Sequence, residues 1–347
     1  MAARRLRRFL VAAGASRAAG SLARYARPTT ACGAACSSVL TLGDGDLSCA
    51  AALAAAGVDV VATTLDAEAD LDARYGARAV ERADALDARC GVDATDPPAD
   101  LGRFDRVIFN FPHVMGKQNI GRNRALLASV CEAAEDRLLA PSGELLIALD
   151  GGQAGTAPDL PSGGEDDAWK RSWQLDVAAA EAGLLVAAVE PFETFYETRG
   201  HRGLGGADAR VREVQKARAF TPRDACVYVL ARADELQAPA ASAAAFVFEV
   251  QFFGSVDDDE AVCEALAAAA GGHALGVRRM DRYTHADGRT AHAFELTLGS
   301  RTVALPRDAA DAIRVSVEEA CEGLGFESRT EKMGRRISRP RPWPRFY

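Results

Sequence analysis

A short segment of alternating glycines and acids has the composition of a cofactor-binding turn. Residues 42–48 read LGDGDLS and lie between an apolar run and an alanine-rich stretch. Gly43 and Gly45 allow a tight turn and a close approach of the backbone to a ligand, and a helix beginning there would offer free N–H groups. The G-x-G-x-x-S spacing suits a dinucleotide, but Asp44 and Asp46 would repel a pyrophosphate. Acids beside the glycines suit a cofactor with positive ammonium and sulfonium groups, such as S-adenosylmethionine.

Two further acids follow the next predicted strands. Asp66 comes after an apolar strand predicted over residues 58–63, where an acid accepts hydrogen bonds from ribose hydroxyls. Asp93 lies within a short strand-like segment, residues 91–95, and could accept from the adenine amino group. Surface acids are common, but acids at three successive strand ends favour a cofactor site. The predicted cofactor-binding residues are Gly43, Asp44, Gly45, Asp46, Ser48, Asp66 and Asp93.

A second turn, Asn110-Phe111-Pro112-His113, follows the strongest strand signal of the chain, at residues 106–111. Its amide oxygen or backbone carbonyls could accept from the N–H of a base, and enzymes that act on a base must first take it out of its stack. His113 could act as a general base because its ordinary pKa lies near neutrality. A structural histidine bonded to the backbone is an equal alternative. We predict Asn110, Pro112 and His113 as catalytic residues.

Strands and helices alternate over residues 39–232, which predicts an α/β fold with a doubly wound parallel sheet. The ligand site of such a sheet lies beyond the carboxyl ends of its strands. Strands are predicted at residues 39–42, 58–63, 91–95, 106–111, 144–149, 184–189 and 225–231. Helices are predicted at residues 47–56, 69–90 with a break near Gly76, 119–139 and 172–182.

The remainder of the chain predicts a second unit. A linker is expected over residues 233–245. Residues 246–330 then follow the order βαββαβ, which is typical of an α+β ferredoxin-like sandwich. Residues 331–347 form a basic, aromatic tail whose prolines oppose regular structure.

Composition limits the class of protein. The chain has 347 residues, of which 48% are hydrophobic and 26% charged, as in ordinary globular proteins. An apolar stretch of about 18 uncharged residues would be needed to span a membrane, and none is present. The 8 cysteines form no CxxC pair, which favours buried single thiols over a disulfide framework or a zinc site. No metal is predicted.

The first 38 residues differ from the rest in charge. They contain seven arginines and no acid, whereas the whole chain has a net charge of −8. We predict that residues 1–38 are a transit-like basic leader addressed to a mitochondrion or plastid. The alternative is a disordered basic arm that binds nucleic acid, in a protein of the cytoplasm or nucleolus.

Four motifs in order resemble the Rossmann-like family of large-subunit rRNA (uridine-N(3))-methyltransferases. They are LGDGDLS at 42–48, VDAT at 92–95, FDRVIFNFPH at 104–113 and IGRNRALL at 120–127, and the likeness runs over about residues 39–231. The resemblance implies S-adenosylmethionine as cofactor and methylation of uridine N3. Asp44, Leu47, the turn at residues 150–152 and the segment 195–200 depart from the family pattern, near the expected substrate side.

The second unit is similar to the ferredoxin-fold anticodon-binding domain, with VRRMDRY at residues 277–283 as the main likeness. This implies RNA binding through shape and phosphate contacts, although a dimerisation or purely structural module is equally compatible. The predicted RNA contacts of the first unit are Phe111, Tyr196, Arg199 and Arg202.

The prediction is therefore an S-adenosylmethionine-dependent RNA methyltransferase that modifies uridine N3 in large-subunit rRNA. Its partner would be rRNA, with tRNA as a second possibility. No membrane partner is predicted, and the sequence indicates no protein partner. One alternative is a non-catalytic tRNA- or rRNA-binding protein with a methyltransferase-like scaffold. Another is a methyltransferase that acts on a protein or small molecule.

Overall fold

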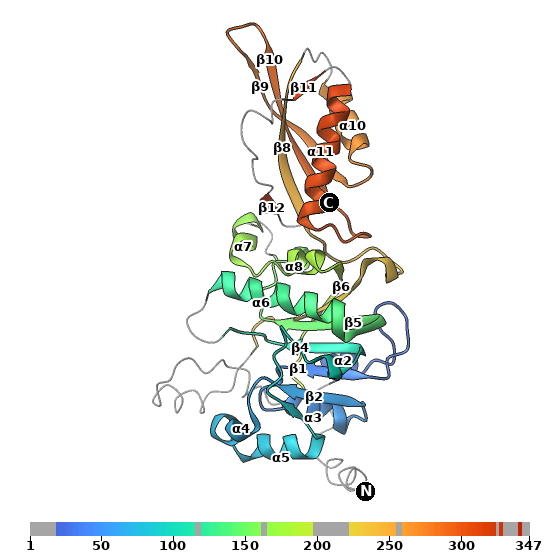
Figure 1. Ribbon diagram of the computed structural model, residues 1–347, viewed down its shortest axis with the longest axis vertical. Helices are drawn as coiled ribbons and strands as arrows, with labels where there is room; N and C mark the ends of the chain where they lie inside the picture. Colours follow the sequence, from blue (N-terminus) through green and yellow to red (C-terminus); the bar gives the residue numbers. More distant parts are fainter. Residues whose placement is uncertain are drawn as a thin grey trace.

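The structure, a computed structural model, describes residues 19–114, 119–160, 165–196, 222–254, 259–323, 326–328 and 339–341. Two units are stacked along its long axis, each built on its own β-sheet (Figure 1). None of the described helices is long and apolar enough to cross a membrane.

The first unit contains a seven-stranded sheet in the order β3-β2-β1-β4-β5-β7-β6. Its strands are β1 (Val39–Leu42), β2 (Val60–Thr64), β3 (Arg89–Cys90), β4 (Phe104–Asn110), β5 (Leu139–Leu149), β6 (Leu184–Pro191) and β7 (Cys226–Arg232). The five strands from β3 to β5 pair in parallel, as predicted. The prediction of a wholly parallel sheet is wrong for β7, which runs antiparallel to both β5 and β6.

Helices cover both faces of this sheet, which explains why its central strands are continuous apolar runs. Residues of α6 (Ile120–Ala133) and α8 (Leu175–Glu181) pack on one face, and α3 (Ser48–Ala55) packs on the other. The predicted break at Gly76 separates α4 (Glu68–Tyr75) from α5 (Ala77–Leu86), because Gly76 has a φ of 86°. The helix predicted over 119–139 ends as a π-helical turn, η2 (Ala134–Leu138). A further helix, α7 (Glu165–Arg171), precedes α8.

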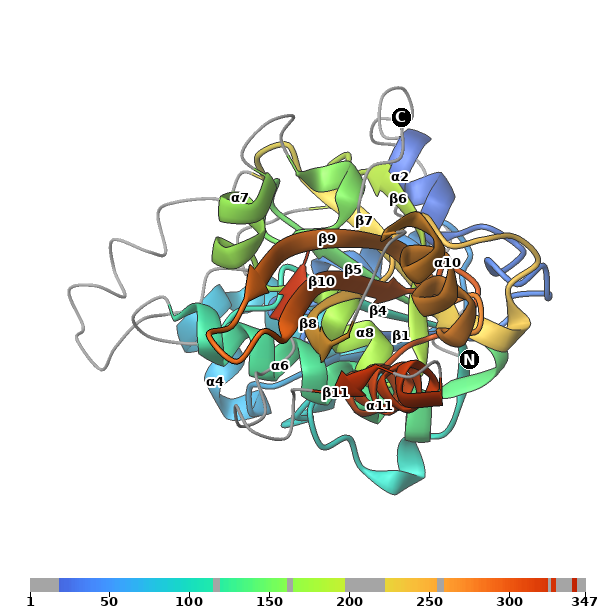
Figure 2. The same cartoon turned by 90° about the horizontal axis from the view of Figure 1, so that it is seen from above.

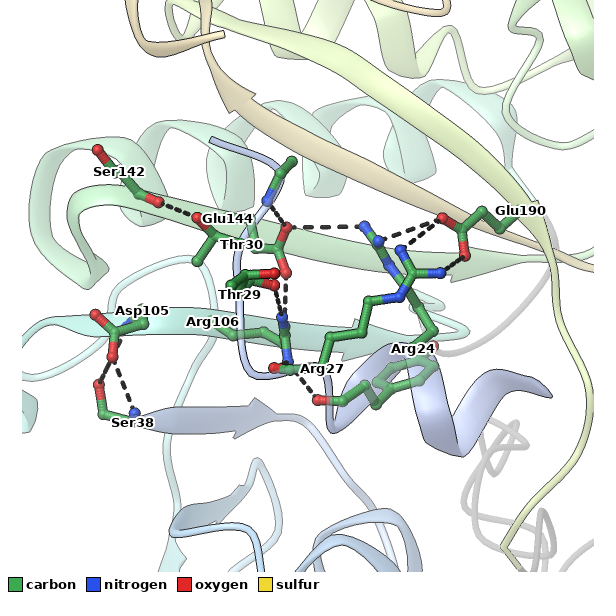
Figure 3. Close-up of polar contacts among 12 residues, drawn as sticks. Arg24, Arg27, Thr29, Thr30, Ser38, Asp105, Arg106, Ser142, Glu144 and Glu190 are labelled. Carbon is green, nitrogen blue, oxygen red and sulfur yellow. Dashed lines mark hydrogen bonds and ion pairs between the residues drawn. The ribbon is translucent and has the colours of Figure 1, made fainter. Parts of the chain in front are cut away.

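The leader predicted over residues 1–38 is too long, because its second half belongs to the fold. Residues 1–18 lie outside the described part. Helix α2 (Ala19–Tyr25) ends in a tyrosine with no exposed surface. The guanidinium of Arg106 on β4 then donates to the carbonyl oxygens of Tyr25, Arg27 and Thr29 (Figure 3). Residues 25–29 of this acid-free segment are therefore bound by a charged side chain of β4, about 80 residues later in the chain.

The second unit has the element order βαββαβ that the sequence predicts. Its elements are β8 (Ala245–Phe253), α10 (Asp259–Ala269), β9 (Ala274–Thr284), β10 (Thr290–Gly299), α11 (Arg307–Gly323) and β11 (Glu327–Ser328). The sheet order is β11-β8-β10-β9 with antiparallel pairing throughout. Helix α10 lies against β9 and α11 against β8, as the view from above shows (Figure 2).

Two connecting segments are more ordered than predicted. Within the linker expected over 233–245, Ala240 and Ala243 are buried, and the amide of Ala241 donates to the carbonyl oxygen of Val186 on β6. Within the tail expected to lack structure, β12 (Arg339–Arg341) pairs with β8. Both differences have one cause: the segments complete edges of existing sheets, which local composition does not reveal.

The two units also contact each other directly. Ala180 of α8 belongs to the hydrophobic core of the second unit. The amide of Arg307 donates to the carboxylate of Glu181 at 3.0 Å. The second unit is thus packed on the end of the first.

Candidate active site

The carboxyl ends of β1, β2 and β4 meet at one edge of the first sheet. Leu42 of β1 pairs with Phe109 of β4, and the amide of Asp44 donates to the carbonyl oxygen of Thr63 on β2 at 3.1 Å. The turn at residues 43–48, Asp66 and the turn at residues 110–113 therefore lie next to one another. This is the juxtaposition that the sequence predicts.

Gly43 and Gly45 both have left-handed backbone conformations, with φ values of 55° and 47°. A β-carbon on Gly43 would lie 3.0 Å from Cε2 of Phe109. The glycine at this position thus serves both the turn and the close packing of β1 on β4.

The two acids of the turn cap the helix that follows. The carboxylate of Asp44 accepts from the amides of Cys49 at 3.2 Å and Ala50 at 2.7 Å. The Oδ1 atom of Asp46 accepts from the amide and hydroxyl of Ser48. Our prediction that α3 offers free N–H groups to a ligand is therefore wrong for residues 48–50, whose amides bind side chains of the turn itself.

Burial changes the charge of this turn. Both carboxylates are almost fully buried, and burial raises the pKa of Asp44 to about 8. Asp46 is neutralised differently, since its Oδ2 atom lies 3.0 Å from the guanidinium of Arg82 on α5. The capped helix end has no free amide at these positions for a phosphate. The site therefore suits a cofactor without phosphate groups, and S-adenosylmethionine is one.

Asp66 lies at the end of β2 with 8% of its surface exposed. Its carboxylate binds the guanidinium of Arg74 and the hydroxyl of Tyr75, the latter at 2.5 Å. Each carboxylate oxygen can accept two hydrogen bonds, so Asp66 keeps one acceptor position on each oxygen. Two positions on one carboxylate match the paired hydroxyls of a ribose.

Asp93 is exposed, and its Oδ1 atom accepts from the amide of Thr95 at 2.8 Å and from its hydroxyl at 2.7 Å. These two hydrogen bonds stabilise the turn at residues 93–95, which follows the short strand β3. It stays a predicted contact for the adenine end of the cofactor.

The side chain of Asn110 is turned towards the interior of the protein. Its Oδ1 atom accepts from the hydroxyl of Tyr25 at 2.7 Å, and its Nδ2 atom donates to Sγ of Cys49 at 3.5 Å. Only 5% of Asn110 is exposed. Local sequence gives no signal for either partner, because Tyr25 lies in the segment predicted as a leader and Cys49 in an alanine-rich helix.

The aromatic rings predicted to contact RNA are core residues. The Phe111 ring contacts Phe192 edge-on at 4.9 Å, and the Tyr196 ring lies 6.2 Å from Phe192. Both side chains are buried in this structure, so neither ring is exposed to an RNA as the prediction requires. Phe111 has a φ of 49°, a left-handed conformation that costs about 1–3 kcal/mol in a non-glycine residue. The other two predicted RNA contacts, Arg199 and Arg202, lie outside the described residues.

His113 is half-buried at the rim of the turn, beside the buried Pro112. Burial lowers the pKa of His113, so its imidazole is neutral at pH 7 and able to accept a proton. The amide of Val114 donates to Oδ1 of Asn123 at 3.3 Å, which ties the turn to α6.

The turn after β5, residues 150–152, is hydrogen-bonded to the segment that precedes β7. The carboxylate of Asp150 accepts from the amide of Arg223 at 3.1 Å, and the amide of Gly151 donates to the carbonyl oxygen of Arg223. A β-carbon on Gly151 would lie 2.9 Å from the carbonyl oxygen of Asp224. The turn at residues 150–152, which departs from the family pattern, is therefore packed against the residues that lead into β7.

Comparison with known proteins relates the first unit to a methyltransferase family. Residues 40–199 match the family of BMT5-like rRNA (uridine-N3-)-methyltransferases. The ferredoxin-fold anticodon-binding domain-containing protein 1 homolog of Mus musculus is 37% identical over 166 residues, which are 44% of this chain and 26% of that protein. The Homo sapiens protein is 34% identical over 187 residues, 47% of this chain and 28% of that one. The chain thus spans about a quarter of the length of the curated relatives it matches.

Among solved structures, TrmN from Thermus thermophilus is 18% identical, with 61% of this chain and 47% of that one covered and a TM-score of 0.34. Similarity at this level is too low to indicate a substrate.

Proposed function

We propose that this protein is an S-adenosylmethionine-dependent RNA methyltransferase, because residues 40–199 match the family of BMT5-like rRNA (uridine-N3-)-methyltransferases. Its proposed target is N3 of a uridine in large-subunit ribosomal RNA. One observation supports the proposal most strongly: the acid-capped glycine turn and the turn from Asn110 to His113 follow neighbouring parallel strands.

In the proposed complex, the turn from Gly43 to Ser48 holds the methionine end of the cofactor through its backbone. Asp66 accepts from the ribose hydroxyls, and Asp93 binds the adenine end. When bound, the cofactor supplies an electrophilic methyl group on a positive sulfonium.

The acceptor base would lie at the turn from Asn110 to His113. Uridine N3 carries a weakly acidic proton that must leave as the methyl group arrives. The neutral imidazole of His113 could accept that proton directly or through one water molecule. Holding the base next to the methyl donor would supply much of the remaining acceleration.

The second unit is proposed to bind the RNA at a distance from the site. Strand β9 exposes three arginines, one of which (Arg278) forms an exposed ion pair with Glu295. It also exposes Met280, which is 51% exposed, and Tyr283, which is 60% exposed. These arginines are Arg278, Arg279 and Arg282. Guanidinium groups bind phosphates, and an exposed tyrosine can stack on a base. We call these five residues the β9 patch.

A non-catalytic RNA-binding protein is the second candidate, and one observation favours it. The amide of Asn110 is bonded to Tyr25 and Cys49, and one acceptor position on each oxygen of Asp66 is taken by Arg74 or Tyr75. If these contacts do not open for ligands, the methyltransferase domain would be a scaffold and the β9 patch would carry the function.

Two measurements separate these candidates. Mass spectrometry of nucleosides from large-subunit rRNA should show N3-methyluridine that is lost in cells without the protein and restored by the wild-type gene. Calorimetry should detect S-adenosylmethionine binding to the purified chain. Binding of RNA without either signal would support the non-catalytic candidate, and transfer of the methyl group to protein alone would reject RNA as the substrate.

A further inference from the structure

The loop that follows β5 binds one of its own carboxylates. Gly152 and Gly155 both have left-handed backbone conformations, with φ values of 77° and 75°. The amide of Gly152 donates to Oδ1 of Asp159 at 2.8 Å, and the amide of Gly155 donates to Oδ2 at 3.3 Å. Backbone amides that converge in a turn form an anion-binding concavity. Asp159 is therefore an anion bound by the loop that precedes it.

A third donor lies beside this carboxylate and is not used. The side chain of Tyr228 on β7 has no exposed surface, and its hydroxyl has no hydrogen-bond partner among the described residues. Burial raises the pKa of Tyr228 and the neighbouring Asp159 carboxylate raises it further, so the hydroxyl keeps its proton. A buried donor without a partner is unfavourable. The carboxylate of Asp159 therefore satisfies two of the three donors that surround it.

A phosphate group differs from a carboxylate in shape. The two oxygens of a carboxylate lie in one plane with their carbon, whereas the oxygens of a phosphate are arranged as a tetrahedron. A phosphate can therefore accept from Gly152 and Gly155 and still direct an oxygen towards Tyr228. Asp159 ends a short turn, η3 (Ala157–Asp159), and is not part of a strand, so its side chain can be displaced without breaking the sheet.

The loop lies beside the proposed acceptor site. Asn110 of β4 pairs with Ala148 of β5, and the amide of Phe111 donates to the carbonyl oxygen of Ala148 at 2.8 Å. Gly151 and Gly152 are exposed, so a ligand can reach the loop from solvent. An RNA whose base enters the turn from Asn110 to His113 would carry its backbone past this edge of the sheet.

Charge explains why the loop holds its own anion in the free protein. Asp150 and Asp224 flank the loop, and the exposed Arg223 supplies a guanidinium beside Asp150. With Asp159 in place, three carboxylates face one guanidinium, and an outside anion is repelled. Withdrawal of Asp159 removes one of these negative charges and frees the two glycine amides.

We infer that the loop from Gly151 to Gly155 is a phosphate site that Asp159 occupies in the free protein. Its ligand is a phosphate of the RNA backbone next to the acceptor nucleotide, which displaces Asp159 and accepts from the Tyr228 hydroxyl. This inference rests on the proposed function and deepens it, because such a contact distinguishes an RNA from a free base.

The test variant is Asp159→Ala, which removes the internal anion. Asp159→Asn, which keeps a neutral acceptor, replaces it if the alanine variant does not fold. The matched control is Asp105→Ala, because Asp105 also accepts from two backbone amides, those of Ser37 at 2.8 Å and Ser38 at 3.0 Å, at the opposite edge of the sheet. The full chain is measured for thermal stability, for binding of a labelled single-stranded oligouridylate by fluorescence anisotropy, and for binding of inorganic phosphate by calorimetry.

We expect Asp159→Ala to bind the oligouridylate about tenfold more tightly than the wild type, since a competing charged hydrogen-bond acceptor is gone. Adding Tyr228→Phe to this variant should remove about threefold of the gain. Asp105→Ala should lower thermal stability without a change in RNA affinity. Asp159→Asn should change RNA affinity in the same direction as Asp159→Ala, by a smaller factor.

Unchanged or weaker RNA binding in a folded Asp159 variant would overturn the inference and leave Asp159 as a cap of its own loop. Tighter binding of inorganic phosphate without tighter binding of RNA would overturn the RNA backbone as the ligand. These outcomes are separate from the proposed function. Intact rRNA methylation without a gain in affinity would reject only the phosphate site, whereas a gain in a protein that methylates no RNA would support the site and reject the methyltransferase.

Discussion

The guanidinium of Arg106 and the carboxylate of Glu144 meet at 2.6 Å on the neighbouring strands β4 and β5, and neither side chain is exposed. Glu144 also accepts from the amide of Ala31 at 2.7 Å, and Arg106 binds three backbone carbonyl oxygens of the α2 segment. This pair is therefore the link that joins residues 24–31 to the centre of the sheet (Figure 3).

Glu144→Gln should strongly destabilise the fold. The variant leaves the Arg106 charge buried without its counter-ion, which typically costs about 3–5 kcal/mol. Urea unfolding should therefore show a much lower midpoint. Asp100→Asn is the control, because it breaks the exposed pair with Arg89 and such pairs contribute at most about 1 kcal/mol. Equal effects of the two variants would contradict the role assigned to the buried pair.

Asp66→Asn should weaken cofactor binding. A hydrogen bond to a charged group contributes about 1.5–3 kcal/mol, so calorimetry should show at least about a tenfold loss of S-adenosylmethionine affinity. Asp70→Asn on the exposed surface of α4 is the matched control and should bind like the wild type. Unchanged affinity in Asp66→Asn, with the fold intact by circular dichroism, would remove Asp66 from the cofactor site.

Asp44 should make stability depend on pH. Burial raises its pKa from 3.8 to about 8, so the folded protein holds this proton more tightly than the unfolded chain does. Its contribution to stability is complete below about pH 4 and is lost as the pH rises to about 8. Asp44→Asn keeps an oxygen that can cap α3 but cannot ionise. The free energy of unfolding of the wild type relative to this variant should therefore fall between pH 5 and pH 8, and a constant difference would contradict the prediction.

The β9 patch should supply phosphate contacts. Replacing Arg278, Arg279 and Arg282 together by glutamine should weaken RNA binding and make it less dependent on salt. The logarithm of the binding constant falls linearly with the logarithm of the salt concentration. For single-stranded RNA, each lost phosphate contact makes this slope shallower by about 0.7, so the loss of three contacts changes it by about 2. Fluorescence anisotropy at several salt concentrations measures this slope. Arg89→Gln, at the far edge of the first sheet, should leave it unchanged, and an unchanged slope in the triple variant would exclude the β9 patch as an RNA surface.

Local sequence was sufficient for most elements of the first unit. The sequence predicts the strand of residues 39–42 to the residue, because a run of three apolar residues and a β-branched threonine stops at the glycine of a turn. Alternation of strands and helices indicated a doubly wound sheet. The antiparallel β7 was not predicted, since the apolar pattern of a buried strand carries no information on its direction.

The sequence by itself determined which residues could do chemistry: the glycine–acid turn, Asp66 and the turn from Asn110 to His113 all follow short apolar strands. The tertiary structure decided what their side chains do. Asp44 caps a helix, Phe111 lies in an aromatic core, and Asn110 is held by Tyr25, 85 residues earlier in the chain. The physical reason is distance along the chain. Periodicity and turn chemistry act over a few residues, whereas a buried hydrogen bond or ion pair depends on which strands become neighbours.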